Sequence, residues 1–136
     1  RSVPVISISV DPRRDARWQY RLGQTLAPLR DAGVLIVGSG SLTHNLRALD
    51  WRAPPGIGTP EARAFTDWAL DHLAAGRDTA LLDWESAPQA RFNHPTPEHW
   101  LPLPIAAGAA SGSPSPRIHA ATFEYGVLAQ HALRWQ

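Results

Sequence analysis

The chain has 136 residues, a formal net charge of +1 and a charged fraction of 18%, which suits one domain, or part of one, with its own core. All 13 basic residues are arginines, and because they form no basic stripe or tail, nothing indicates a nucleic acid or an anionic membrane as partner. Cysteine is absent, which excludes disulfides and thiol nucleophiles and leaves His, Asp and Glu as metal ligands. No apolar run approaches the roughly 18 residues of a membrane span, so we expect a soluble, cytoplasmic protein.

The first part of the chain predicts a strand, a helix and a second strand. Apolar residues alternate with serines over 6–10, which predicts a short strand within 3–10. Asp15 is a suitable N-cap for a helix over 16–30, which Pro28 is expected to end early or bend. The apolar run Val34–Val37 precedes a Gly-Ser-Gly turn and predicts a buried strand of a parallel or mixed sheet.

The middle of the chain predicts helices. Residues 41–49 are expected to form a helix or a helical turn. Thr59 and Pro60 are a capping residue and a first-turn proline, which together predict the start of a helix that ends at Gly76. A short helix is expected over 79–84.

The last part predicts one more helix and two strands. Thr96 as N-cap and Pro97 at the first helical position predict a helix over 97–110 that places His99 in its first turn, where backbone N–H groups are free. Residues 118–125 and 127–135 predict two strands in a hairpin, although the second could also form a helix. The order of elements favours the α/β class, with a mixed central sheet flanked by helices.

Two histidine motifs are candidates for chemistry. His44 follows the strand predicted at 34–37, in the zone beyond the carboxyl end where α/β sheets build their sites. His94, Glu98 and His99 bring two imidazoles and a carboxylate into six residues. Each of these side chains could instead have a structural role, as a loop hydrogen bond or as a charge that complements a helix dipole. The Gly-x-Gly turn matches only part of a dinucleotide fingerprint, because Thr43 holds the place of the third glycine.

The two motifs together resemble the class III extradiol ring-cleavage dioxygenases, the LigB-like superfamily, and within it the DOPA 4,5-dioxygenase-type branch. The resemblance rests on three stretches, Val34–Arg47, His94–Leu103 and Phe123–Leu128. It implies a LigB-like extradiol dioxygenase fold in which residues 1–136 form a single domain, the C-terminal portion of the catalytic domain. Two further histidines that complete the family's metal site would belong to an N-terminal half.

The resemblance also implies a non-haem metal, Fe(II) before zinc, that binds a catechol whose ring is opened with O2. His44 would be the acid–base histidine and could also touch the metal, and His99 would be a metal ligand. His94 and Tyr125 would contact the substrate. A site of two histidines and one carboxylate would use Glu98 as ligand, whereas a three-histidine site would use His99. We expect His99, with Glu98 beside it in support.

Other functions stay open. The chain could be an inactive fragment or an interaction domain that keeps the family scaffold, because two histidines are too few to hold Fe(II) or zinc firmly. A metallohydrolase could use the same histidines. As partners we expect a small catechol and O2, the missing half or a partner chain, and a second copy of the chain, since a fragment exposes surface that its other half covers.

Overall fold

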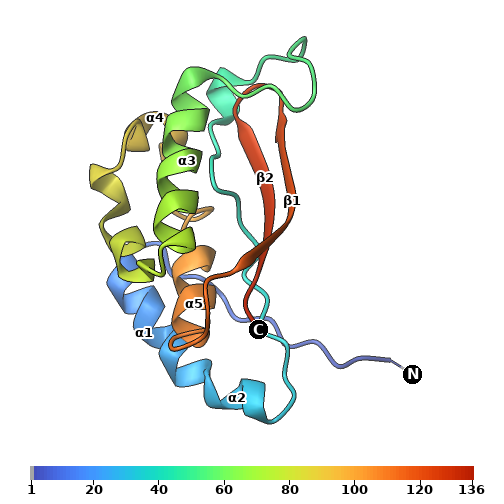
Figure 1. The fold of residues 1–136 in the computed structure, drawn as a ribbon, viewed down its shortest axis with the longest axis vertical. Helices are drawn as coiled ribbons and strands as arrows, with labels where there is room; N and C mark the ends of the chain where they lie inside the picture. Colours follow the sequence, from blue (N-terminus) through green and yellow to red (C-terminus); the bar gives the residue numbers. More distant parts are fainter. Residues whose placement is uncertain (1) are drawn as a thin grey trace.

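The computed structural model describes residues 2–136. Helices α1, α3, α4 and α5 lie on one side of a two-stranded hairpin (Figure 1). In chain order the elements are α1 (Ala16–Leu26), α2 (Pro28–Asp31), the 3-10 helix η1 (Leu46–Ala48), α3 (Pro60–Ala74), the 3-10 helix η2 (Asp78–Ser86), α4 (Ala90–Asn93), α5 (Pro102–Ala109), β1 (Arg117–Glu124) and β2 (Leu128–Arg134). Within residues 2–136, no helix combines the length and apolar character needed to cross a membrane.

The predicted helix starts of α1 and α3 are confirmed. The Asp15 carboxylate accepts a hydrogen bond from Trp18 N at 2.7 Å, and the Thr59 hydroxyl accepts one from Ala62 N at 3.3 Å. Both bonds satisfy backbone donors that a helix leaves free in its first turn. Pro28 divides the predicted helix, since α1 ends before it and α2 begins at it.

A buried aromatic cluster forms much of the core on the helical side. It comprises Phe65 and Trp68 of α3, Trp84 of η2, and His94 and Trp100 from the segments beside α4 and α5. Phe65 and Trp100 are fully buried, and their ring centroids lie 5.2 Å apart in an edge-on arrangement. Such contacts add specific geometry to the burial of apolar area.

The predicted hairpin is confirmed as an antiparallel pair. Strands β1 and β2 pair with Thr122 opposite Gln130. Their turn places Tyr125 at a φ of 50° and Gly126 at a φ of 73°. Two successive residues at positive φ are what a tight hairpin turn requires. The predicted combination of helices and sheet is thus observed, with a small antiparallel sheet as its β part.

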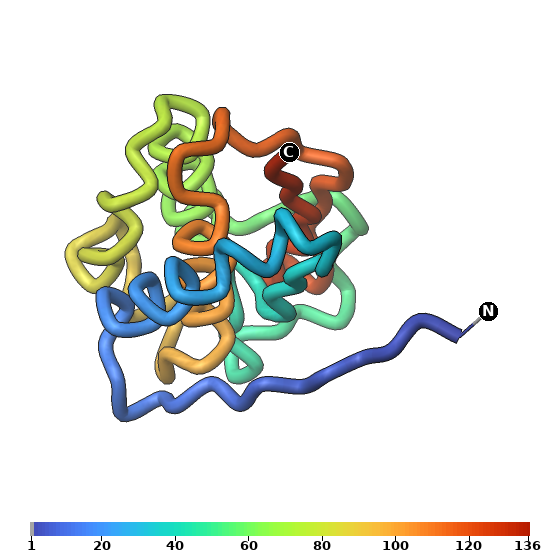
Figure 2. The backbone as a smooth tube through the Cα atoms, turned by 90° about the horizontal axis from the view of Figure 1, so that it is seen from below, coloured from blue at the N-terminus to red at the C-terminus, as the bar shows by residue number. Residues whose placement is uncertain are grey.

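The strands predicted over 3–10 and 34–37 are wrong for residues 2–136, which contain no strand there and no mixed sheet. A strand needs a neighbour for its backbone groups, and these segments have none within the described chain. Their apolar side chains are exposed: Ile6 is 88% accessible and Leu35 is 85% accessible. Figure 2 shows the N-terminal segment extending away from the rest of the molecule.

The helix predicted from Pro97 begins five residues later than expected. Residues 95–101 form bends and turns, and α5 starts at Pro102. Prolines at 102 and 104 lack the N–H groups that a helix begun at 97 would need there, and their rings would clash with the preceding turn. Pro102 therefore occupies the first position of α5, and His99 lies in the turn before it.

Candidate functional site

His44 and His99 are brought together by the fold. Their imidazole rings stack with centroids 3.4 Å apart and planes 9° apart, and both residues are half-buried. Neither belongs to a helix or strand, so their contact depends on how the two segments that carry them are joined. We call these segments the 41–45 loop and the 92–99 segment.

Backbone and amide hydrogen bonds join the two segments directly. Ser41 N donates to His99 O at 2.9 Å, and His44 N donates to Asn93 O at 2.8 Å. The Asn45 side-chain amide donates to Phe92 O at 2.6 Å. All three bonds run from donors of the 41–45 loop to carbonyl oxygens of the 92–99 segment, and they fix the places from which His44 and His99 project.

The 41–45 loop is also anchored to the hairpin. The buried Thr43 hydroxyl donates to Val127 O at 2.8 Å and accepts from Ala129 N at 2.8 Å. The Gly-Ser-Gly turn gains a physical role here, because a Cβ on Gly40 would collide with His99 O. Sequence reasoning missed Thr43 as a support of the site, since nothing in its neighbours marks a buried hydroxyl.

The surroundings of His44 favour its neutral imidazole form. Burial, and next to it the proximity of His99, lower the pKa of His44. A positive charge on His44 would lie directly against the stacked His99 ring, which disfavours the imidazolium form of His44. A neutral ring nitrogen is what a proton acceptor or a metal ligand requires.

Glu98 and Tyr125 lie at the surface. Glu98 is exposed, and its carboxylate accepts a hydrogen bond from the Thr96 hydroxyl at 2.8 Å. Its own backbone N–H, followed by that hydroxyl, holds the Glu98 pKa below its usual value. Tyr125 is 37% accessible, and its ring lies 4.8 Å from that of Trp51, a contact that no local sequence pattern predicts.

His94 differs from the other candidates because it is buried, with 3% of its surface accessible. Its Nε2 lies 2.8 Å from Leu42 O. Burial lowers the pKa of His94 to about 4, so the ring is neutral near pH 7.

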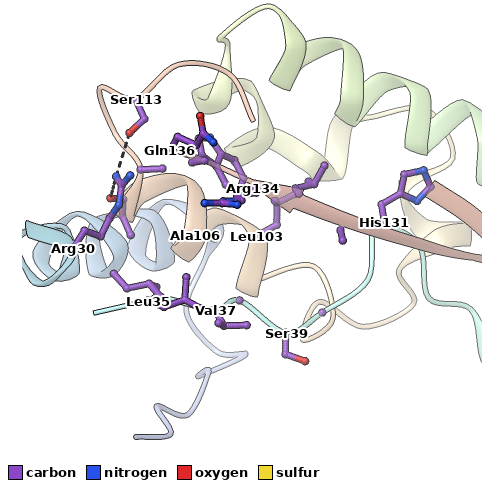
Figure 3. A pocket seen from close by; sticks show the side chains of 18 of the residues that line it. Arg30, Leu35, Val37, Ser39, Leu103, Ala106, Ser113, His131, Arg134 and Gln136 are labelled. Carbon is purple, nitrogen blue, oxygen red and sulfur yellow. Dashed lines mark hydrogen bonds between the residues drawn. The ribbon is translucent and has the colours of Figure 1, made fainter. Parts of the chain in front are cut away.

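A cavity of about 1020 Å³ adjoins His99. Its walls come from residues 33–42, from α5 and from the end of β2 (Figure 3). Leu35 and Val37 line one side, with Leu103 and Ala106 of α5 near them. The cavity therefore follows the apolar run for which a strand was predicted, and His99 belongs to its lining.

The imidazole nitrogens of the site are suitable metal ligands, but they are too few to form a complete ligand set. The Nδ1 atom of His99 is buried and has no hydrogen-bond partner in residues 2–136, and imidazole nitrogen is a good ligand for iron and zinc. Among these residues, however, no group of three His, Asp or Glu side chains is placed to hold an ion. The described part of the chain thus offers only part of a ligand set.

Comparisons with known proteins agree with this partial site. The family model described as the catalytic LigB subunit of aromatic ring-opening dioxygenase matches residues 1–133. The chain belongs to the LigB family. A 4,5-DOPA dioxygenase extradiol of Beta vulgaris is 38% identical over 93% of this chain and 47% of its own length. One from Escherichia coli K12 is 31% identical over the same shares.

A solved structure shows the same fold. An uncharacterised protein of Escherichia coli K12 superposes with a TM-score of 0.82 at 30% identity, over 92% of this chain and 52% of that one. The α/β fold of a LigB-like protein is therefore confirmed. The chain spans about half the length of the curated relatives it matches, as the resemblance to one portion of a catalytic domain predicts.

Proposed function

We propose that the chain carries part of the active site of a non-haem, metal-dependent extradiol dioxygenase that opens the ring of a catechol with O2. The observation that supports this proposal is the stacked pair of His44 and His99. The two residues are far apart in the sequence, and hydrogen bonds between their segments bring them together. The curated relatives named as 4,5-DOPA dioxygenases make a catechol the substrate class of choice.

His44 would act as the base that takes a proton from a catechol hydroxyl. Its lowered pKa keeps the ring neutral and able to accept that proton, as a general base requires. The resemblance assigns Tyr125 to substrate contact, and its exposed ring beside Trp51 could stack on a planar catechol.

His99 would be the metal ligand, with Fe(II) the first choice and zinc the second. A bound metal would hold catechol and O2 next to each other and stabilise negative charge on the substrate oxygens. Since no group of three candidate ligands exists in residues 2–136, the remaining ligands would come from polypeptide outside this chain. Glu98, at the surface, would support His99 without binding the ion.

The test uses the full-length gene product with Fe(II), a panel of catechols and the yellow colour of ring-opened products. His44→Ala is expected to lower kcat by at least about 100-fold, because general-base catalysis contributes that much. His72→Gln is the matched control, since His72 lies on α3 and its ring accepts a hydrogen bond from Arg77. A metal-loaded wild type that opens no catechol, or a His44→Ala variant with unchanged activity, would contradict the proposal.

A second candidate is a non-enzymatic domain that keeps the family scaffold. The incomplete ligand set favours it, because structural and catalytic metal sites use at least three protein ligands. Metal analysis of the 136-residue chain separates the two ideas. One tightly bound ion per chain would count against the inactive fragment, whereas metal retained only by a longer product would support the dioxygenase.

A further inference from the structure

His94 lies at the junction of the 41–45 loop and the 92–99 segment. Its Nε2 approaches Leu42 O at 2.8 Å. A carbonyl oxygen only accepts hydrogen bonds, so Nε2 carries the hydrogen and donates it. The other ring nitrogen, Nδ1, is buried with no hydrogen-bond partner in residues 2–136. The single N–H of the neutral ring is therefore committed to the loop that carries His44.

The direction of that N–H is fixed by the aromatic cluster. The ring centroid of His94 lies 5.1 Å from that of Phe65, 5.5 Å from that of Trp84 and 5.6 Å from that of Trp100. All three contacts are edge-on, and His94 is buried, so the surrounding rings restrain the orientation of the imidazole. Edge-on contacts of this kind are favourable in themselves. The hydrogen bond to Leu42 therefore extends from the rigid core.

We propose that His94 is a positioning residue, which holds the Leu42 carbonyl so that the His44 ring stays stacked on His99. Leu42 precedes His44 by two residues, and the neighbouring bonds from Ser41 and His44 are made by backbone N–H groups alone. His94 adds a side-chain bond from the buried core to this loop, beside the bond that the Asn45 amide makes to Phe92 O. Its meaning for catalysis rests on the function proposed above. In this role it acts through His44, in place of the substrate contact that the resemblance implied for His94.

Two variants of His94 and one control distinguish the role of its N–H donor from that of its aromatic ring. His94→Phe keeps the aromatic volume but leaves Leu42 O without its donor. His94→Gln keeps an N–H near the place of Nε2. Gln19→Leu is the matched control, because it removes another buried side-chain bond, from Gln19 Nε2 to Asp11 O at 2.9 Å, on α1.

The first readout is NMR of the metal-free chain. Face-to-face rings shift each other's protons upfield, and the His44 amide is protected by its bond to Asn93. In His94→Phe we expect the upfield shifts to disappear and the His44 amide to exchange about tenfold faster, the effect of losing one hydrogen bond. His94→Gln should restore both values, and Gln19→Leu should leave both unchanged.

A folded His94→Phe variant with unaltered ring shifts and amide exchange would overturn the proposal. If that variant does not fold, His94→Asn takes its place under the same criteria, because its amide is too short to reach Leu42. In the full-length gene product, His94→Phe should lower kcat by about 100-fold with little change in KM. A wild type that opens no catechol defeats the proposed function only, and the NMR comparison then decides the positioning role.

Discussion

The stacked histidines show how a site is built from residues outside regular structure. His44 and His99 each depend on backbone hydrogen bonds made by the other's segment, and on side chains that the core holds still. Thr43 ties the loop to β2, and His94 ties it to the aromatic cluster. The chemistry-bearing side chains are half-buried, while those that place them are buried. The accessible histidines are thus held in place by buried residues next to them.

His94 makes stability depend on pH in a definite window. The unfolded ring titrates near 6.5 and the folded ring at about 4. Between these values the unfolded state binds one more proton, so the free energy of unfolding decreases as the pH is lowered. The contribution is complete above pH 6.5 and lost by pH 4, and it amounts to about 3 kcal/mol. Urea unfolding from pH 7 to pH 4 measures it. In His94→Gln this part of the pH dependence should vanish; an unchanged profile would contradict the assignment.

At the scale of elements, α1 and α5 pack closely against each other through two glycines. A Cβ on Gly23 would collide with Ile105 O, and one on Gly108 would collide with Tyr20 O. Each helix therefore presents a glycine where the backbone of the other passes. This contact fixes α5, and with it the turn before α5 that carries His99.

Replacing either glycine should force the two helices apart. We expect Gly23→Ala and Gly108→Ala each to lower the free energy of unfolding by about 1–3 kcal/mol, the usual cost of overpacking. Arg21→Ala, on an exposed position of α1, is the control and should change it by less than about 0.5 kcal/mol. Chemical denaturation measures all three. Gly→Ala variants as stable as the wild type would show that the helices can separate without cost.

Elements with local signals could be predicted from the sequence, and those that need distant partners could not. Asp15, Thr59 and the hairpin turn act within a few residues, so the helix starts and the hairpin were right. The start predicted for α5 is wrong because Pro102 and Pro104 do not allow a regular helix begun at Pro97, although Thr96 and Pro97 are typical of a helix start. The site was predicted as two motifs, but the stacking of its rings and the supports at Thr43 and His94 depend on packing that no local pattern reveals.

At the scale of the whole molecule, the segments at 3–10 and 34–37 have sequences typical of sheet strands. They pair with no other strand in the described residues, and their apolar side chains are exposed. Val5 is 85% accessible and Val37 is 73% accessible. Apolar strand-like segments with free backbone groups are templates for pairing with another chain. The chain also spans about half the length of its curated relatives. Both facts favour a partner polypeptide along these segments.

We therefore predict that the 136-residue chain associates in solution. Light scattering should give a mass above that of a monomer, rising with concentration. Ile6→Lys with Leu35→Lys should shift the chain toward monomer, because charges on open strands oppose pairing. Ile57→Lys, at another exposed apolar residue on a loop, is the matched control and should leave association unchanged. A wild-type chain that is monomeric at every concentration would contradict this prediction.

The central claim is that His44 and His99 belong to a site that opens aromatic rings. Oxygen uptake by the Fe(II)-loaded full-length gene product, measured together with the loss of catechol, tests it most directly. We predict one O2 consumed for each ring opened in the wild type, and no uptake above background in His44→Ala. Catechol left intact by the metal-loaded wild type, or equal uptake by the two proteins, would contradict the claim.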